Sequence, residues 1–130
     1  MNSKLYTSYI RNQPCLIKQD NFRVDAHHTG GTTNRFTGLA KRNFDFAQVP
    51  LQHDLHMQLH EIGESIFWKT FNVSPTKAVI NLMSNFCVQS KIFIPYNLIE
   101  KKKLALDERK DFVEEFGEYI YEILQDEEDS

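Results

Sequence analysis

The stretch VPLQHDLHMQLH, residues 49–60, joins an extended apolar segment to the first turns of an amphipathic helix. Within it, His56 and His60 are four residues apart, so on a helix they project from one face, one turn apart. Two imidazoles at that spacing can share one cation. All five histidines of the chain lie in this stretch or in the pair His27–His28, and this pair is the obvious source of a third ligand.

The segments around these histidines predict two strands and a helix. Residues 22–26 alternate in polarity and lead into His27–His28, which indicates a strand. The Gly- and Thr-rich residues 29–38 predict a loop, and residues 45–51 an extended segment. A helix is expected from about His53 to Phe71, with Gly63 interrupting it. Its expected core face consists of Leu55, Leu59, Ile62, Ile66 and Phe67.

The remaining segments are expected to be mostly helical. Residues 5–12 predict a short helix, and Ser74-Pro75 is typical of a helix start, with Ser as the N-cap. Residues 88–95 predict a short strand or extended segment. Residues 107–125 carry a strong apolar stripe, which predicts an amphipathic C-terminal helix followed by a frayed acidic end at 126–130.

Length and composition place the chain among α+β proteins of one domain. Its 130 residues allow a modest core, and 41% hydrophobic with 25% charged residues is usual for a soluble globular protein. We expect a small core over about 13–70, a helical C-terminal extension over about 74–125 and an acidic tail over 126–130. No apolar run approaches a membrane span, and residues 1–10 lack a signal-peptide core, so a cytoplasmic location without a membrane partner is expected.

The net charge of −3 is unevenly distributed. Residues 1–45 carry seven Lys or Arg against three Asp or Glu, residues 46–103 carry six against four, and residues 104–130 carry two against eleven. A mildly basic body with an acidic end fits a polyanion binder whose tail takes no part in binding. An exposed acidic helix on a neutral enzyme explains the same distribution.

Strand, loop, strand and helix, with histidines at the end of the first strand and on the helix, is the layout of a ββα-metal nuclease. Residues 25–31 (DAHHTGG), Asp45 through Val49-Pro50-Leu51, and residues 56–60 (HMQLH) resemble phage and prophage HNH endonucleases, in particular the recombination-enhancement (Ref-like) kind. The resemblance covers about 13–68 and takes in Gly63 and Trp68. The rest of the chain does not share it.

The resemblance implies a role for each matching histidine. His27, His56 and His60 would ligate a divalent metal ion, and His28 would be the general base that activates water for phosphodiester hydrolysis. Mg²⁺ or Mn²⁺ is the expected ion, and an all-imidazole ligand set also suits Zn²⁺ and Ni²⁺. A free imidazole can act as a base near neutral pH because it titrates near pH 6.5.

The chain departs from the family at two places. Many members hold a structural zinc ion with cysteines. Here Cys15 remains, but Lys18, Gln52 and Leu55 occupy the positions of the other zinc ligands, so no structural cysteine zinc site is expected. Ala47 stands where the family has its asparagine. Asp45 is our candidate for the hydrogen bonding that this asparagine provides.

Other polar residues have two interpretations. Arg35, Lys41 and Arg42 would contact the DNA backbone or simply be solvated, and His53 would face solvent or a phosphate. The run 101–103 (KKK) is expected at a solvated helix start, with DNA contact as the alternative. Phe67 and Trp68 are expected in the core rather than on a stacking platform.

The sequence therefore predicts a metal-dependent HNH endonuclease, a hydrolase acting on double- or single-stranded DNA, with a recombination or phage protein as a further partner. A catalytically degenerate HNH-fold module that binds DNA or protein is the main alternative. The missing asparagine and zinc ligands favour this alternative, and the four histidines oppose it. An acidic-tailed inhibitor or adaptor is a third interpretation, in which the C-terminal helix is the functional surface.

Overall fold

A two-stranded antiparallel sheet and the helices around it make this an α+β structure. The computed structural model describes residues 1–33, 44–104 and 110–129. Strands β1 (Val24–His28) and β2 (Gln48–Gln52) pair in the register His27 to Val49. The described helices are α1 (Lys4–Arg11), α3 (His53–Ile62), α4 (Glu64–Thr70), α5 (Pro75–Gln89), α6 (Tyr96–Leu104) and α7 (Lys110–Asp129), with a 3-10 turn, η1 (Asp45–Ala47).

Helix α3 runs along β1 because β2 leads directly into it. The His53 N–H donates to the Arg23 carbonyl at 2.8 Å, which extends the strand pairing to the first residue of the helix. The start of α3 therefore lies beside the start of β1, and the next turns pass along the strand. This arrangement places the histidines of α3 beside those of β1.

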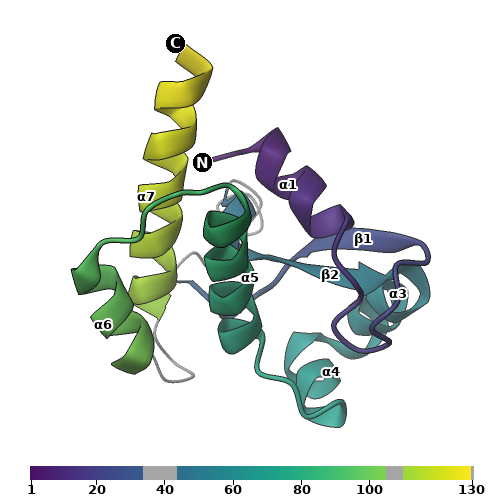
Figure 1. Cartoon of the computed structure of the whole chain (residues 1–130). Helices are drawn as coiled ribbons and strands as arrows, with labels where there is room; N and C mark the ends of the chain where they lie inside the picture. Colours follow the sequence, from purple (N-terminus) through teal and green to yellow (C-terminus); the bar gives the residue numbers. More distant parts are fainter. Residues whose placement is uncertain (34–43, 105–109, 130) are drawn as a thin grey trace.

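The core lies mainly between the sheet, α1, α5 and α7, with α5 in the middle (Figure 1). Tyr6 of α1 is fully buried, and its ring centroid lies 4.8 Å from that of Phe46 and 5.0 Å from that of Phe86. The Tyr9 hydroxyl donates to the Leu82 carbonyl at 2.9 Å, which ties α1 to α5. Aromatic packing of this kind holds the N-terminal helix against the centre of the fold.

Several predicted helix boundaries are confirmed. Ser74 is the N-cap of α5, and its Oγ accepts a hydrogen bond from the Lys77 N–H at 3.3 Å. Gly63 separates α3 from α4 with a φ of 92°, a conformation that side-chain-bearing residues rarely adopt. Phe67 and Trp68 are buried, as expected.

Other sequence predictions are wrong. Residues 88–95 do not form a strand, since α5 continues to Gln89 and a turn follows. Residues 45–47 form η1 rather than an extended segment, and α7 continues to Asp129 instead of fraying at 126. Ile66 is 60% exposed, because the break at Gly63 turns α4 away from the periodicity of α3. The lysine run 101–103 lies in the second half of α6, not at its start.

Helix α7 packs against α5 and η1 at the end of the sheet opposite the start of α3. Within residues 1–33, 44–104 and 110–129, none of the helices combines the length and apolar character that crossing a membrane requires.

Gly117 of α7 allows the helix to approach the aromatic core, and Gly117→Ala tests this contact. An added Cβ would lie 2.4 Å from Cζ of Phe44 and 3.0 Å from Cβ of Phe46. Alanine normally favours a helix over glycine, but here we expect a loss of about 1–3 kcal/mol in the free energy of unfolding. Denaturant unfolding measures it, with exposed Glu118→Ala as the control. A Gly117→Ala variant as stable as the wild type would contradict this packing.

Candidate metal centre

Three histidine side chains from two elements meet at one point. His27 comes from the end of β1, and His56 and His60 come from successive turns of α3. One ring nitrogen from each can be chosen so that all three lie within 4.8 Å of one another, and this is the only such group found in the described part of the chain. His27 is buried, His56 is partly exposed and His60 is exposed, so the group opens to solvent on the α3 side. The structure thus brings together the three predicted metal ligands.

Two carboxylates fix which nitrogen of each ring faces this point. Asp25 Oδ2 lies 3.0 Å from His56 Nδ1, and Glu64 Oε1 lies 2.7 Å from His27 Nε2. A carboxylate accepts hydrogen bonds, so each neutral ring places its single proton on the nitrogen that faces the carboxylate. The lone pairs of His56 Nε2 and His27 Nδ1 are then left to face the centre.

The inward-facing nitrogens are close enough to share a proton or a metal ion. His27 Nδ1 and His60 Nε2 each lie 3.1 Å from His56 Nε2. Two nitrogens bound to one ion at about 2.1 Å lie about 3.0–3.4 Å apart in octahedral or tetrahedral geometry. Two lone pairs at that separation repel each other unless a proton or a metal ion lies between them. The donor set and its spacing therefore fit a divalent metal ion, with further coordination positions open toward solvent.

Glu64 is the most highly connected residue beside the centre. Its Oε1 accepts from His27 Nε2 and from the Gly30 N–H at 2.9 Å, and its Oε2 accepts from Trp68 Nε1 at 2.7 Å. Burial raises the pKa of Glu64, but the hydrogen bond and charge of His27, with the other two donors, outweigh this and lower the pKa on balance. Glu64 is therefore held as a carboxylate that fixes the orientation of His27.

Asp25 has a similar role on the other side of the centre. Its Oδ2 contacts both His56 and His53, the latter through Nδ1 at 2.8 Å. Partial burial raises the pKa of Asp25, and the hydrogen bonds from His56 and His53 together lower it below its ordinary value. His53 was predicted to face solvent or a phosphate. Its side chain is partly exposed, and it contacts the same Asp25 carboxylate as His56.

His28 faces a different partner. Its Nε2 lies 2.9 Å from Asp45 Oδ1, and Asp45 Oδ2 accepts a hydrogen bond from the Ser3 N–H at 2.7 Å. His28 does not belong to the three-histidine group. Asp45 contacts His28 as the hydrogen-bonding role proposed for it requires. Neutral His28 would donate from Nε2 to Asp45 and keep the lone pair on Nδ1.

The other predicted site residues lie elsewhere. Arg35, Lys41 and Arg42 fall outside the described residues. Cys15 is buried, and its Sγ accepts a hydrogen bond from the backbone N–H of Gln52 at 3.3 Å. This thiol is part of the packing beneath β2.

Sequence reasoning missed Asp25 and Glu64 as orienting residues. Asp25 stands two residues before His27, so both project from one face of the strand. Glu64 continues the series His56, His60 and Glu64 at intervals of four, with Trp68 next. The series was a visible signal, but the predicted break at Gly63 removed the reason to expect one continuous face.

Comparison of the chain with protein-family models, curated proteins and solved structures finds no match in any of the three.

The three-histidine group predicts that divalent metal ions stabilise the protein. Ions that bind only the folded state at 100 times their dissociation constant add about 2.7 kcal/mol to the free energy of unfolding. Thermal unfolding with Mn²⁺, Ni²⁺, Zn²⁺ or EDTA measures this shift. Because His60 is exposed, His60→Ala should fold normally in EDTA and lose most of the metal-dependent shift. Exposed Glu61→Gln is the control, and a wild-type protein that no ion stabilises would refute the site.

Glu64→Gln tests the orienting carboxylate. Three donors face Glu64, and an amide offers only one acceptor oxygen, so at least one donor loses its partner. Loss of a partner that orients a metal ligand typically weakens metal binding about 10–100-fold. Isothermal titration of Glu64→Gln against Glu61→Gln measures the effect. Equal metal affinity in the two variants would show that Glu64 has only a packing role.

Proposed function

We propose that this protein is a metal-dependent endonuclease that hydrolyses phosphodiester bonds in DNA. The observation that carries the proposal is the convergence of three imidazole nitrogens, two of them oriented by Asp25 and Glu64, together with the neighbouring residue His28, which is hydrogen-bonded to Asp45. A metal-ligand set next to an oriented base is what phosphodiester hydrolysis requires. The resemblance of residues 25–31 and 56–60 to HNH endonucleases supports the same reaction.

His27, His56 and His60 would hold the ion, whose positive charge stabilises the negative charge that develops on the phosphate and on the leaving 3′ oxygen. His60 is exposed, so phosphate and water would be able to reach an ion held by these three side chains. Mg²⁺ or Mn²⁺ would fill these remaining positions with oxygen ligands, and Zn²⁺ or Ni²⁺ suits the imidazoles.

His28 would remove the proton from the attacking water. Asp45 fixes the ring by accepting from Nε2, and Ser3 in turn fixes Asp45. The lone pair on Nδ1 then receives the proton, and the Asp45 carboxylate stabilises the imidazolium that forms. The side chain of His28 is 25% exposed, so water and substrate can reach it.

The resemblance extends the proposal to biological context. It supports a phage or prophage nuclease that acts in the cytoplasm during recombination, on double- or single-stranded DNA. The basic excess of residues 1–45 favours contact with the DNA backbone, to which Arg35, Lys41, Arg42 and His53 would contribute.

A second candidate function is a metal-binding DNA or protein module without catalysis. The observation that favours it is the placement of His28, which contacts Asp45 and stays outside the three-histidine group. Adjacent residues of a strand project to opposite faces, so His27 and His28 need not serve the same reaction.

Substitution of His28 separates the two candidates. His28→Ala should reduce cleavage of plasmid and single-stranded DNA by about 10²- to 10⁴-fold, because the general base is lost. Its metal affinity and its DNA binding should stay close to those of the wild type. His60→Ala should instead lose metal affinity and cleavage together.

A gel assay across Mg²⁺, Mn²⁺, Ni²⁺ and EDTA measures cleavage, with Glu61→Gln as the control for both variants. Equal cleavage by wild type and His28→Ala would show that the base is another group. No cleavage by the wild type with any ion would favour the non-catalytic module.

A further inference from the structure

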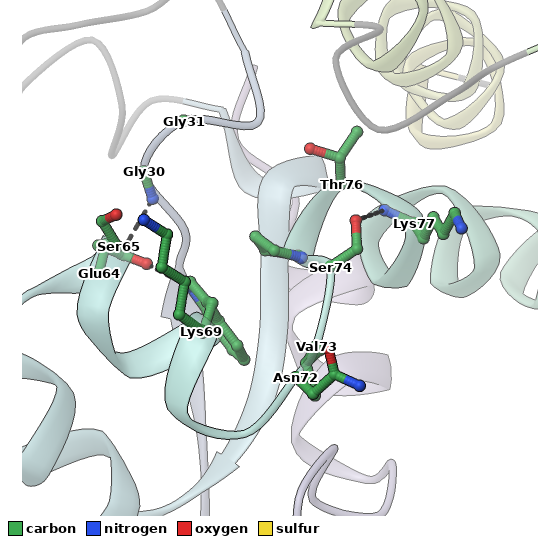
Figure 2. Close-up of a pocket in the computed structure, with 12 residues that line it drawn as sticks. Gly30, Gly31, Glu64, Ser65, Lys69, Asn72, Val73, Ser74, Thr76 and Lys77 are labelled. Atoms are coloured by element: carbon green, nitrogen blue, oxygen red, sulfur yellow. Dashed lines mark hydrogen bonds between the residues drawn. The ribbon is translucent and has the colours of Figure 1, made fainter.

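A cavity of about 960 Å³ lies beside the metal centre, between α4, the N-terminal end of α5 and the turn after β1. Figure 2 shows its walls, with Gly30, Gly31 and Glu64 on one side and Thr76 on the other. Glu64 also orients His27, so the cavity and the metal centre share a wall. Its volume falls in the range of roughly 300–1,000 Å³ that is usual for small-ligand sites.

The wall next to the metal centre carries a cation. Lys69 is exposed, and Figure 2 shows its amino group reaching toward Gly30 and Glu64. Lys69 forms no ion pair with any described residue. A lysine in this position can bind a phosphate group of DNA, next to the phosphate that the candidate metal centre would hold.

The opposite wall carries a hydroxyl that faces the cavity from a largely buried residue. Thr76 is 4% exposed, and its hydroxyl makes no hydrogen bond within the described residues. Figure 2 shows this hydroxyl turned toward the space between α5 and Gly30. This hydroxyl lines the cavity and keeps its hydrogen-bonding capacity for a polar ligand there. The N-terminal end of the 15-residue helix α5 adds positive potential at the same wall.

The rest of the lining is mixed, with the polar residues Ser65, Asn72, Ser74 and Lys77 beside an apolar part. Trp68, Val73 and Pro75 line the cavity, and Trp68 is 5% exposed. An apolar part with Trp68 between the Lys69 cation and the polar Thr76 side of the cavity matches a nucleotide, which has an anionic phosphate, a planar apolar face and a polar base edge.

We propose that this cavity binds one unpaired nucleotide of the DNA strand that is cleaved, with its phosphate at Lys69 and its base edge at Thr76. The proposal deepens the nuclease function proposed above and rests on it for the choice of DNA. A base enclosed in the cavity cannot remain paired, and extrusion from a duplex costs a few kcal/mol. The protein therefore binds single-stranded DNA more tightly than a duplex of the same sequence.

Trp68 provides a direct test because it is the only tryptophan of the chain and it lines the cavity. Its emission is followed during titration with a short single-stranded DNA of mixed sequence, and with the duplex of that sequence, in EDTA. We expect the single strand to change the emission of the wild type and to bind more tightly than the duplex. No change in Trp68 emission on DNA binding, or equal affinity for the duplex, would overturn the proposal.

Two variants locate the contacts. Lys69→Gln should weaken single-strand binding roughly tenfold and lower the salt dependence of binding by about 0.7, the value for one phosphate contact. Thr76→Val preserves shape and should weaken binding about threefold to tenfold without changing the salt dependence. The control is Lys91→Gln, an exposed lysine after α5. Both variants matching Lys91→Gln would refute the pocket.

The design separates this proposal from the nuclease proposal. Binding is measured in EDTA, so it does not require the metal ion or cleavage. A protein that binds the single strand through Lys69 and Thr76 but never cuts DNA would retain the pocket and lose the nuclease function. A protein that cuts DNA equally well with Lys69→Gln and Thr76→Val would retain the nuclease function and lose the pocket.

Discussion

The direct connection from β2 into α3 is the constraint on which the site depends. The His53 N–H donates a hydrogen bond to the Arg23 carbonyl, so the helix starts beside the first residue of β1 and runs along the strand. With a rise of about 1.5 Å per residue, α3 advances by about one helical turn between His56 and His60. Asp25 and His27, two residues apart on the strand, both lie beside the turn that carries His56. Asp25 Oδ2 is 3.0 Å from His56 Nδ1 and His27 Nδ1 is 3.1 Å from His56 Nε2, and the His27 ring lies 5.6 Å from that of His60.

Electrostatics determines what this arrangement can bind. Burial disfavours the charge of Glu64, yet its pKa is lowered because three donors point at it. A partly buried carboxylate that accepts from three donors is a fixed negative charge, and it keeps the proton of His27 on Nε2, away from the centre. Asp25 does the same for His56. The two carboxylates convert a cluster of histidines, which would otherwise share protons, into a set of aligned lone pairs.

The sequence predicts those parts of the fold and site that depend on local signals. The N-cap at Ser74, the break at Gly63 and the three ligand candidates follow from residue type and spacing. The exposure of Ile66 does not, because the turn after Gly63 changes the face that α4 presents. Glu64 was missed because its contact with His27 spans 37 residues and depends on tertiary packing.

Glu64 couples the metal centre to the neighbouring cavity. It stands in the first turn of α4, where a carboxylate is favoured by the helix dipole, and Gly63 with a φ of 92° turns it back toward His27. The same residue holds the Gly30 N–H, so the turn after β1, the ligand His27 and the cavity wall are positioned by one side chain. A change at Glu64 would therefore affect both the candidate metal ligand His27 and the cavity, whereas Lys69 and Thr76 line only the cavity. This separation lets substitutions distinguish the binding of a nucleotide from the binding of the ion.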